Sequence, residues 1–323
     1  MKKNIAILMG GYSSEFDISL NSGNVVYKHL DTNKFVPYRI VITKNQWYYL
    51  DDNEQQHPIN KADFSLPLTD HTIQFDAAFN TVHGTPGEDG LLQAYFELIR
   101  IPQTACDFYQ AALTFNKRDC ISSLKPYGIP CATNYLLNKG DSIDIQAIVD
   151  TVGLPCFVKA NKSGSSYGVS KAKTAADILP AIEIAYKEDD EIIIESFLSG
   201  TEVSVGVIQY EGKTKVLPIT EIVSENEFFD YEAKYLGKSE EITPARLDPE
   251  QQKNVETLAK KIYELLKMKG FSRSEYIFHN GTPHFVEMNT NPGLNEASIL
   301  PQQAQKAGIS LSQLFTSVIE NCI

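Results

Sequence analysis

Residues 273–293 constrain this chain more than any other segment, because they place carboxylates inside strands that otherwise resemble core. Residues 276–278 and 285–288 contain the aromatic and β-branched side chains that are typical of strands. Between them, Asn280-Gly281 is the dipeptide that most strongly favours a tight turn, since both residues tolerate positive φ. The segment therefore predicts a β-hairpin.

The charged residues of this hairpin point to a metal site. Burying an unpaired carboxylate is costly, yet Glu275, Glu287 and Asn289 all lie within its strands. A two-residue turn would place Glu275 opposite Val286, whereas an odd-length turn places it opposite Glu287. Two like charges directly opposed are destabilising unless a cation lies between them. Oxygen ligands of this kind suit Mg²⁺ or Mn²⁺ together with nucleotide phosphates.

We therefore predict the odd-length turn, with Arg273 and Asn289 on the same face as the two opposed carboxylates. The alternative is an exposed hairpin with scattered charges and no metal.

Composition argues against several classes of partner. The 323 residues are 42% hydrophobic and 22% charged, as in globular proteins of two or three domains. A formal net charge of -12 argues against a nucleic-acid backbone or an anionic membrane as partner. No apolar stretch approaches a transmembrane length, and the five cysteines show no CxxC spacing. We expect a cytoplasmic protein with reduced thiols.

The N-terminal part predicts an open α/β sheet. A strand at residues 4–9 is followed by a glycine turn and by a helix from about residue 17 to residue 30. A further strand, residues 75–82, ends at a glycine-rich loop that begins with His83. Glu15 and His83 thus lie at strand ends, where such sheets bind ligands. A lone acid or histidine in a loop is, however, more often structural.

The middle of the chain carries a phosphate-binding pattern. The strand predicted at residues 154–159 ends in Lys159, which needs an anion if it is buried. The loop at residues 160–168 is rich in the backbone N–H groups and hydroxyls that form anion-binding nests. Residue Val169 resumes a strand at once, so a flexible linker is the weaker alternative. Residues 224–247 hold four aromatic side chains, which favours an ordered lid.

Eight motifs occur in a single order along nearly the whole chain. They are Gly10-Gly11-x-Ser13-x-Glu15, His83-Gly84-x-x-Gly87-Glu88-Asp89-Gly90, Lys117, Lys159 with Gly164-Ser165-Ser166, Glu195 with Glu202, Asp230-Tyr231-Glu232-Ala233-Lys234-Tyr235, Arg273-x-Glu275, and Glu287-x-Asn289-Thr290-x-Pro292-Gly293. With these motifs the chain resembles the D-alanine–D-alanine ligases of the ATP-grasp superfamily. It departs from that family at Glu275, where aspartate is usual, and at Ala160, where proline is common.

The resemblance implies an α/β fold that is α+β in its ATP-binding part. An ATP-grasp fold of this kind has an N-terminal domain with an open parallel sheet, and it holds the nucleotide between two antiparallel sheets. The implied domains are an N-terminal substrate-binding domain (1–105), a central ATP-grasp subdomain (106–194) and a C-terminal subdomain with the metal site (195–323). The family also suggests a homodimer, although nothing in the sequence itself shows the interface.

The implied activity is the ATP-dependent joining of two D-alanine molecules through an acyl phosphate, for peptidoglycan precursor synthesis. Phosphoryl transfer needs neutralisation of spreading negative charge, and the tetrahedral oxyanion needs fixed donors. The resemblance assigns Glu15, Ser165, Tyr235, Arg273 and Gly293 to catalysis, Glu15, His83 and Ser298 to D-alanine, Lys117, Lys159, Ser165, Glu195, Leu198, Glu202 and Lys234 to ATP, and Glu275, Glu287 and Asn289 to two Mg²⁺ or Mn²⁺ ions.

Three other functions remain open from the sequence. A different ATP-grasp carboxylate–amine ligase, or a D-alanine–D-lactate ligase, would share most of these residues. Tyr235 favours an amine as second substrate, because lactate-using relatives usually carry a different residue there. A nucleotide-binding regulator without catalysis is the third, and the intact Arg273, Lys117 and Lys159 argue against it.

Overall fold

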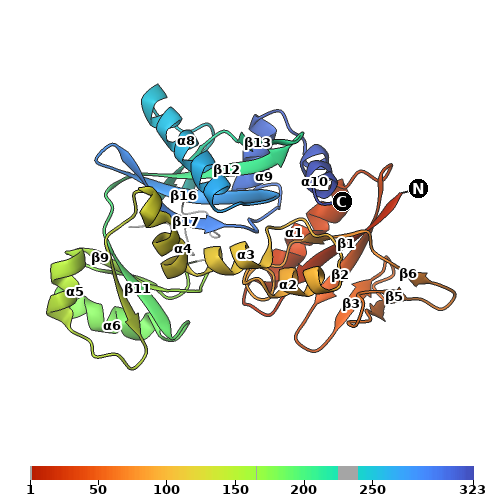
Figure 1. Ribbon diagram of the computed structural model, residues 1–323, viewed down its shortest axis with the longest axis horizontal. Coiled ribbons are helices and arrows are strands. Elements are labelled where there is room, and N and C mark those ends of the chain that lie inside the picture. The colour runs from red at the N-terminus through yellow and green to blue at the C-terminus, as the bar shows by residue number, and fades with distance from the viewer. Residues whose placement is uncertain (1, 165, 225–238) are drawn as a thin grey trace.

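Three main sheets with their helices make up the protein (Figure 1). The computed structural model describes residues 2–164, 166–224 and 239–323. The assignments made to Ser165, Lys234 and Tyr235 therefore lie outside the described residues. Among the described helices, none is both long and apolar enough to cross a membrane.

The N-terminal sheet has the strand order β4-β3-β2-β1-β7. Its strands are β1 (Lys3–Gly10), β2 (Phe35–Ile42), β3 (Trp47–Leu50), β4 (Gln56–Pro58) and β7 (Ala77–Asn80), and its helices are α1 (Phe16–His29) and α2 (Leu91–Leu98). Strand β1 pairs in parallel with β2 and β7, while β3 and β4 add an antiparallel edge. The expected open parallel sheet is thus confirmed, with a mixed edge. A short hairpin, β5 (Leu66–Pro67) and β6 (Thr72–Ile73), lies beside it.

A four-stranded antiparallel sheet follows in the order β10-β9-β11-β8. Its strands are β8 (Asn134–Asn138), β9 (Cys156–Ala160), β10 (Val169–Ala172) and β11 (Glu191–Ser196), and its helices are α5 (Ile145–Val152) and α6 (Ala175–Ala185). Burial alternates along β9, where Cys156, Val158 and Ala160 are buried. This alternation leaves Phe157 and Lys159 on the opposite face of the sheet.

The third sheet has the order β15-β14-β12-β16-β17, with β13 paired to β12. Its strands are β12 (Gly200–Tyr210), β13 (Lys213–Val216), β14 (Thr220–Ser224), β15 (Ser239–Ile242), β16 (Phe271–His279) and β17 (Thr282–Asn289). Helix α8 (Pro249–Leu265) packs on this sheet and begins with a capping box between Asp248 and Gln251. Strands β13 and β14 are separated by a break around Pro218, which lacks a backbone N–H.

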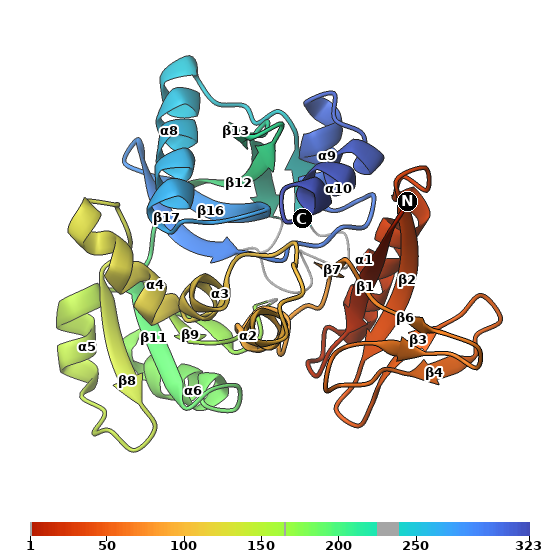
Figure 2. The same cartoon turned by 45° about the vertical axis from the view of Figure 1, so that its right-hand side comes forward.

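The remaining helices join the three parts (Figure 2). They are α3 (Phe108–Phe115), α4 (Lys117–Leu124), the 3₁₀ turn η1 (Lys125–Tyr127), α9 (Ile299–Lys306) and α10 (Leu311–Glu320). Helices α3 and α4 share a core with the six-stranded sheet, for example Ile121 with Tyr276. Helix α10 shares a core with the N-terminal sheet, for example Phe315 with Ile7. The N-terminal, four-stranded and six-stranded sheets thus lie around a common central region, and loops from each sheet reach it.

Helices α3 and α4 are separated at Asn116. The Asn116 side chain accepts a hydrogen bond from the Asp119 N–H and caps α4. Lys117 is therefore the first residue of a helix.

Candidate active site

The β16–β17 hairpin brings Glu275 directly opposite Glu287, and Arg273 opposite Asn289. The predicted facing pairs are confirmed, but the predicted odd-length turn is wrong. His279 pairs with Thr282, so the turn is the two-residue Asn280-Gly281.

A β-bulge between the turn and the site supplies the missing change of register. Tyr276 pairs with Phe285 and Glu275 with Glu287, so Val286 is the extra residue on β17. Burial alternates along β17 except at this point, where Val286 and Glu287 are both half-buried in succession. The bulge therefore turns Glu287 onto the face that carries Glu275.

An inter-sheet cleft lies between the four-stranded and six-stranded sheets. It encloses about 820 Å³, including space open to solvent. The predicted residues that line it are Lys117, Lys159, Glu195, Leu198, Glu202, Glu275 and Glu287. Apolar side chains complete the walls, with Phe157 on one sheet and Ile277 on the other. A cleft with apolar walls and several charged side chains is suited to a planar ring that carries an anionic tail.

Lys159 and Glu195 form a buried ion pair within this cleft, with Nζ 2.6 Å from Oε2. Burial alone would lower the pKa of Lys159, but the charge of Glu195 and its hydrogen bond outweigh that effect. The pKa of Lys159 is therefore raised, and the ammonium keeps its charge beneath the cleft. This lysine was predicted to need an anion, and in the protein alone Glu195 supplies one.

Lys117 reaches the same cleft from the first turn of α4. Its Nζ donates a hydrogen bond to the Ser163 carbonyl at 2.7 Å and lies 3.4 Å from Glu287 Oε2. The ammonium thus connects the loop after β9 with the carboxylate on β17. A second fixed positive charge here would stabilise an anion that enters between the loop and the sheet.

A second, adjoining cavity lies between the N-terminal sheet and the β16–β17 hairpin. The predicted residues that line it are Glu15, His83, Arg273, Glu287, Asn289, Gly293 and Ser298. It shares Gly164 and Glu287 with the inter-sheet cleft, so the two spaces meet at these residues. A Cβ on Gly164 would lie 3.3 Å from Glu15 Oε2, which shows how closely the loop after β9 approaches the N-terminal domain.

Two buried titratable groups lie at the base of the adjoining cavity. Burial lowers the pKa of His83, so its imidazole is held in the neutral form. Burial, followed by the neighbouring Glu15, raises the pKa of Glu88 to about 8. Glu88 Oε2 accepts a hydrogen bond from the Gly84 N–H at 2.7 Å, which fixes the glycine-rich loop.

The segment after β17 is tied to the N-terminal domain by buried hydrogen bonds. Asn291 Nδ2 donates to the Val82 carbonyl at 2.7 Å, and the Leu294 N–H donates to Ser22 Oγ at 3.2 Å. Gly293 lies between these two anchors, and a Cβ there would come within 2.9 Å of Ser298 Oγ. Only a glycine therefore brings the backbone this close to Ser298 without displacing it.

The carboxylates of the hairpin form a donor set suited to a hard cation. Glu275 is buried and its Oε1 lies 2.9 Å from Arg273 Nη2, so existing positive charge already offsets part of the repulsion with Glu287. Asn289 adds an amide oxygen, which accepts the Asn291 N–H at 2.9 Å. Two opposed carboxylates and an amide oxygen match the ligands that Mg²⁺ and Mn²⁺ prefer. Among the described residues, no group of three or more His, Cys, Asp or Glu side chains is placed to hold a metal, and the hairpin offers two carboxylates and one amide.

Four further residues of the site were not assigned from the sequence. Glu88 and Glu241 line the adjoining cavity, and burial raises the pKa of Glu241. Glu88 stood within a recognised motif, whereas Glu241 lies near the end of the aromatic segment 224–247 and carried no pattern of its own. Ser22 and Asn291 act through the hydrogen bonds above, which join positions remote in sequence.

Two antiparallel sheets around a cleft with buried lysines, and an N-terminal α/β domain closing one end, define an ATP-grasp ligase. The family model described as D-ala D-ala ligase N-terminus matches residues 4–106, and that described as D-ala D-ala ligase C-terminus matches residues 124–320. A D-alanine–D-alanine ligase from Christiangramia forsetii is 65% identical over 99% of this chain and 98% of the relative. The chain therefore belongs to the D-alanine–D-alanine ligase family, and it is an ATP-dependent enzyme of that family.

Solved structures agree with this assignment. D-alanyl-alanine synthetase A from Vibrio cholerae has a TM-score of 0.89 at 27% identity, covering 99% of this chain and 98% of that one. The VanG D-Ala:D-Ser ligase from Enterococcus faecalis has a TM-score of 0.87 at 30% identity, covering 100% of both chains. The expected ATP-grasp fold is thereby confirmed.

Proposed function

We propose that ATP occupies the inter-sheet cleft and that the two D-alanine molecules occupy the adjoining cavity. The observation that supports this division is that the two spaces meet at Gly164 and Glu287. A nucleotide with its ring between the sheets would present its terminal phosphate at this junction. The carboxylate of the first D-alanine would reach the same point from the other side.

In this proposal the cleft residues divide by position along the nucleotide. Glu195 and Leu198 contact the adenine, and Glu202 contacts the ribose hydroxyls. Lys117 and Lys159 neutralise the phosphates, because phosphoryl transfer depends on positioning and on fixed positive charge. Ser165 and Lys234 complete the ATP site in the expectation drawn from the sequence.

The reaction proceeds in two steps. An oxygen of the first D-alanine carboxylate attacks the γ-phosphorus, ADP leaves, and an acyl phosphate forms. The amine of the second D-alanine then attacks the acyl carbon, and phosphate leaves as the peptide bond forms. Arg273 and the Gly293 N–H stabilise the tetrahedral oxyanion. Glu15 and His83 hold the first D-alanine, and Ser298 holds the carboxylate of the second.

Glu15 is also expected to act with Ser165 and Tyr235 as the site closes. Closure would exclude the water that otherwise hydrolyses an acyl phosphate.

Glu275, Glu287 and Asn289 are the residues that would hold two Mg²⁺ or Mn²⁺ ions. When bound, such ions neutralise charge on the phosphate oxygens. The chain's own contribution is to hold these oxygen ligands on one face of the hairpin, beside Lys117 and Arg273. We also propose a cytoplasmic location, where ATP is available, and a homodimer, as the family resemblance suggests.

The direct test is phosphate release by the purified enzyme with ATP and Mg²⁺, together with detection of D-alanyl-D-alanine. Phosphate release that depends on D-alanine, and that L-alanine does not support, is the expected result. ATP hydrolysis without dipeptide, or equal turnover of both enantiomers, would contradict the proposal.

A second amine or hydroxy acid as acceptor is the alternative to test in the same assay. The structural similarity to a D-Ala:D-Ser ligase motivates including D-serine, and the sequence analysis motivates including D-lactate. We expect D-alanyl-D-alanine to dominate when D-alanine, D-serine and D-lactate compete at equal concentration.

A further inference from the structure

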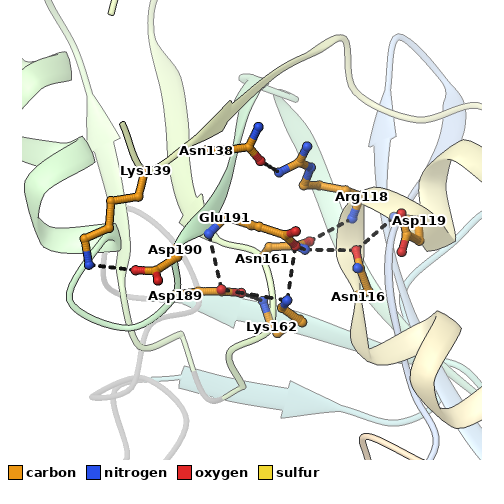
Figure 3. Close-up of polar contacts among 10 residues, drawn as sticks. All are labelled: Asn116, Arg118, Asp119, Asn138, Lys139, Asn161, Lys162, Asp189, Asp190 and Glu191. Carbon is orange, nitrogen blue, oxygen red and sulfur yellow. Dashed lines mark hydrogen bonds and ion pairs between the residues drawn. The ribbon is translucent and has the colours of Figure 1, made fainter. Parts of the chain in front are cut away.

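Asn161 lies at the point where three elements meet, and it is fully buried there (Figure 3). Its side-chain Nδ2 donates to Asn116 Oδ1 at 2.9 Å and to Glu191 Oε2 at 2.8 Å. Its Oδ1 accepts the Arg118 N–H at 2.9 Å. Each polar group of this amide therefore has a partner, and the partners belong to the start of α4 and the start of β11.

The backbone of Asn161 makes two more bonds in the same place. Its N–H donates to the Glu191 carbonyl at 3.0 Å, and its carbonyl accepts the Lys117 N–H at 3.4 Å. Asn161 thus bonds the backbone of Lys117 itself. It also bonds the residue on each side of it, Asn116 and Arg118. Hydrogen bonds at three consecutive residues fix the direction in which the Lys117 side chain leaves the helix.

Asn161 also links the two lysines of the inter-sheet cleft. Lys159 stands two residues before it, on β9, and the loop that begins after it supplies the Ser163 carbonyl to Lys117 Nζ at 2.7 Å. Lys162 adds an ion pair to Glu191 at 3.1 Å, on the outer side of the same cluster. A change at Asn161 would therefore alter the placement of Lys117 relative to Lys159 and to the loop.

We propose that Asn161 is a positioning residue for the nucleotide phosphates: it sets Lys117 against Lys159 across the cleft. The inference rests on the proposed function for the place of ATP. It goes beyond that function because it gives the buried Asn161 amide a role of its own. This amide would set the relative positions of the Lys117 and Lys159 ammonium groups. Asn161 itself does not touch the nucleotide.

If Asn161 only stabilised the fold, its loss would have different effects on the kinetics than if it positioned Lys117. Loss of stability alone would lower the melting temperature and leave both Michaelis constants unchanged. Misplacement of Lys117 would raise the KM for ATP and leave the KM for D-alanine unchanged, because the D-alanine residues lie in the adjoining cavity.

The test is Asn161→Ala, measured by steady-state kinetics in both substrates and by calorimetric titration with a non-hydrolysable ATP analogue and Mg²⁺. We expect the KM for ATP and the Kd of the analogue to rise by about tenfold or more, equivalent to about 1.4 kcal/mol. The KM for D-alanine is expected to change less than about twofold. Equal increases in both KM values, or an unchanged Kd, would overturn the proposal.

The matched control is Arg118→Ala. It keeps the backbone N–H that donates to Asn161 Oδ1 and removes only the side-chain bond to Asn138 at 2.9 Å. The Kd for the analogue is expected to stay within about twofold of the wild type. A rise as large as that of Asn161→Ala would show that the helix surface, and not Asn161, sets the affinity.

Two further variants keep the test decisive if Asn161→Ala does not fold. Asn116→Ala removes the acceptor at the other end of one bond, and the same selective rise in Kd is expected. Asn161→Asp with Glu191→Gln exchanges the amide and the carboxylate, and this pair should bind the analogue more tightly than Asn161→Asp alone. Failure of both expectations would overturn the proposal. Because the titration needs no turnover, it separates this result from any failure of the proposed D-alanine ligation.

Discussion

The hydroxyl oxygen of Ser22 lies 3.1 Å from Nε2 of the buried His83 ring. The same oxygen accepts the Leu294 N–H, so the hydroxyl proton is available to donate to Nε2. In that arrangement the proton of the neutral His83 ring lies on Nδ1, and burial, which lowers the pKa of His83, keeps the ring neutral. One serine of α1 therefore orients a predicted substrate-binding residue and also anchors the segment that contains Gly293.

Ser22→Ala should lower kcat selectively. The change leaves the buried Leu294 N–H and the His83 ring without a shared partner, at a cost of about 1–3 kcal/mol. If that cost falls on the transition state, kcat falls by about tenfold or more, with the KM for ATP unchanged.

Ser19→Ala is the matched control for this variant. Ser19 is also buried on α1, but its hydroxyl bonds the Gly10 N–H and the Thr81 carbonyl, away from Leu294. We expect a similar fall in melting temperature with kcat retained. A parallel loss of kcat in both variants would contradict the role given to Ser22.

Glu88 should make the stability of the protein depend on pH. Its pKa is about 8 in the folded protein, whereas an ordinary glutamate has a pKa of 4.5. Between these values the unfolded chain has released the proton and the folded protein has kept it. The free energy of unfolding should therefore fall as the pH rises from about 5 to about 8.

Comparison with Glu88→Gln isolates this effect. The glutamine keeps an acceptor for the Gly84 N–H and cannot ionise, so its free energy of unfolding should vary less over the same range. The measurement is denaturant unfolding of both proteins at pH 6 and pH 8. Because His83 contributes equally to both, a constant difference between the two proteins would show that Glu88 does not titrate in this window.

Lys159→Met should destabilise the protein as well as weaken ATP binding. It leaves the buried Glu195 carboxylate without its partner, which costs about 3–5 kcal/mol in comparable ion pairs. Adding Glu195→Gln removes the orphaned charge, so the double variant should regain much of the stability and none of the ATP affinity. Additive losses in chemical denaturation would mean that the two groups are not coupled.

Glu287→Gln should retain the fold and lose nearly all turnover, because the carboxylate faces Glu275 and lies beside Lys117 where the two cavities meet. Phosphate release measured over a range of Mg²⁺ concentrations tests this expectation. The exposed Glu264→Gln on α8, where Lys260 lies 3.9 Å away, is the control. Near-normal activity of Glu287→Gln at ordinary Mg²⁺ would show that the metal site has been misassigned.

Local signals in the sequence predicted much of the fold. The strand at residues 4–9, the helix that follows it and the tight Asn280-Gly281 turn each arise from neighbours in the chain, and each is present in the structure. The site residues that could be named in advance belong to motifs, except Leu198 and Ser298, and those described line one of two connected spaces.

Features that depend on distant contacts could not be predicted in this way. The α3–α4 pair precedes the four-stranded sheet in sequence, yet its apolar faces pack in the core of the six-stranded sheet. The bonds of Asn161 and Ser22 join residues tens to hundreds of positions apart, and neither residue stands out by its neighbours. The bulge escaped prediction because alternation in a single strand does not show where a residue is inserted.

Because of the Val286 bulge, the turn of the hairpin does not dictate which residues face each other at its carboxylate site. In a regular hairpin the parity of the chain between two residues decides whether they face each other, so the turn would dictate the site. Because Val286 is left unpaired, a two-residue turn and the facing carboxylates can occur in the same hairpin. If Val286 instead took its place in a regular ladder from the same turn, it would lie opposite Glu275, and Glu287 and Asn289 would point toward the core. The facing of Glu275 and Glu287 thus depends on leaving one apolar residue, which carries no chemistry of its own, out of the ladder.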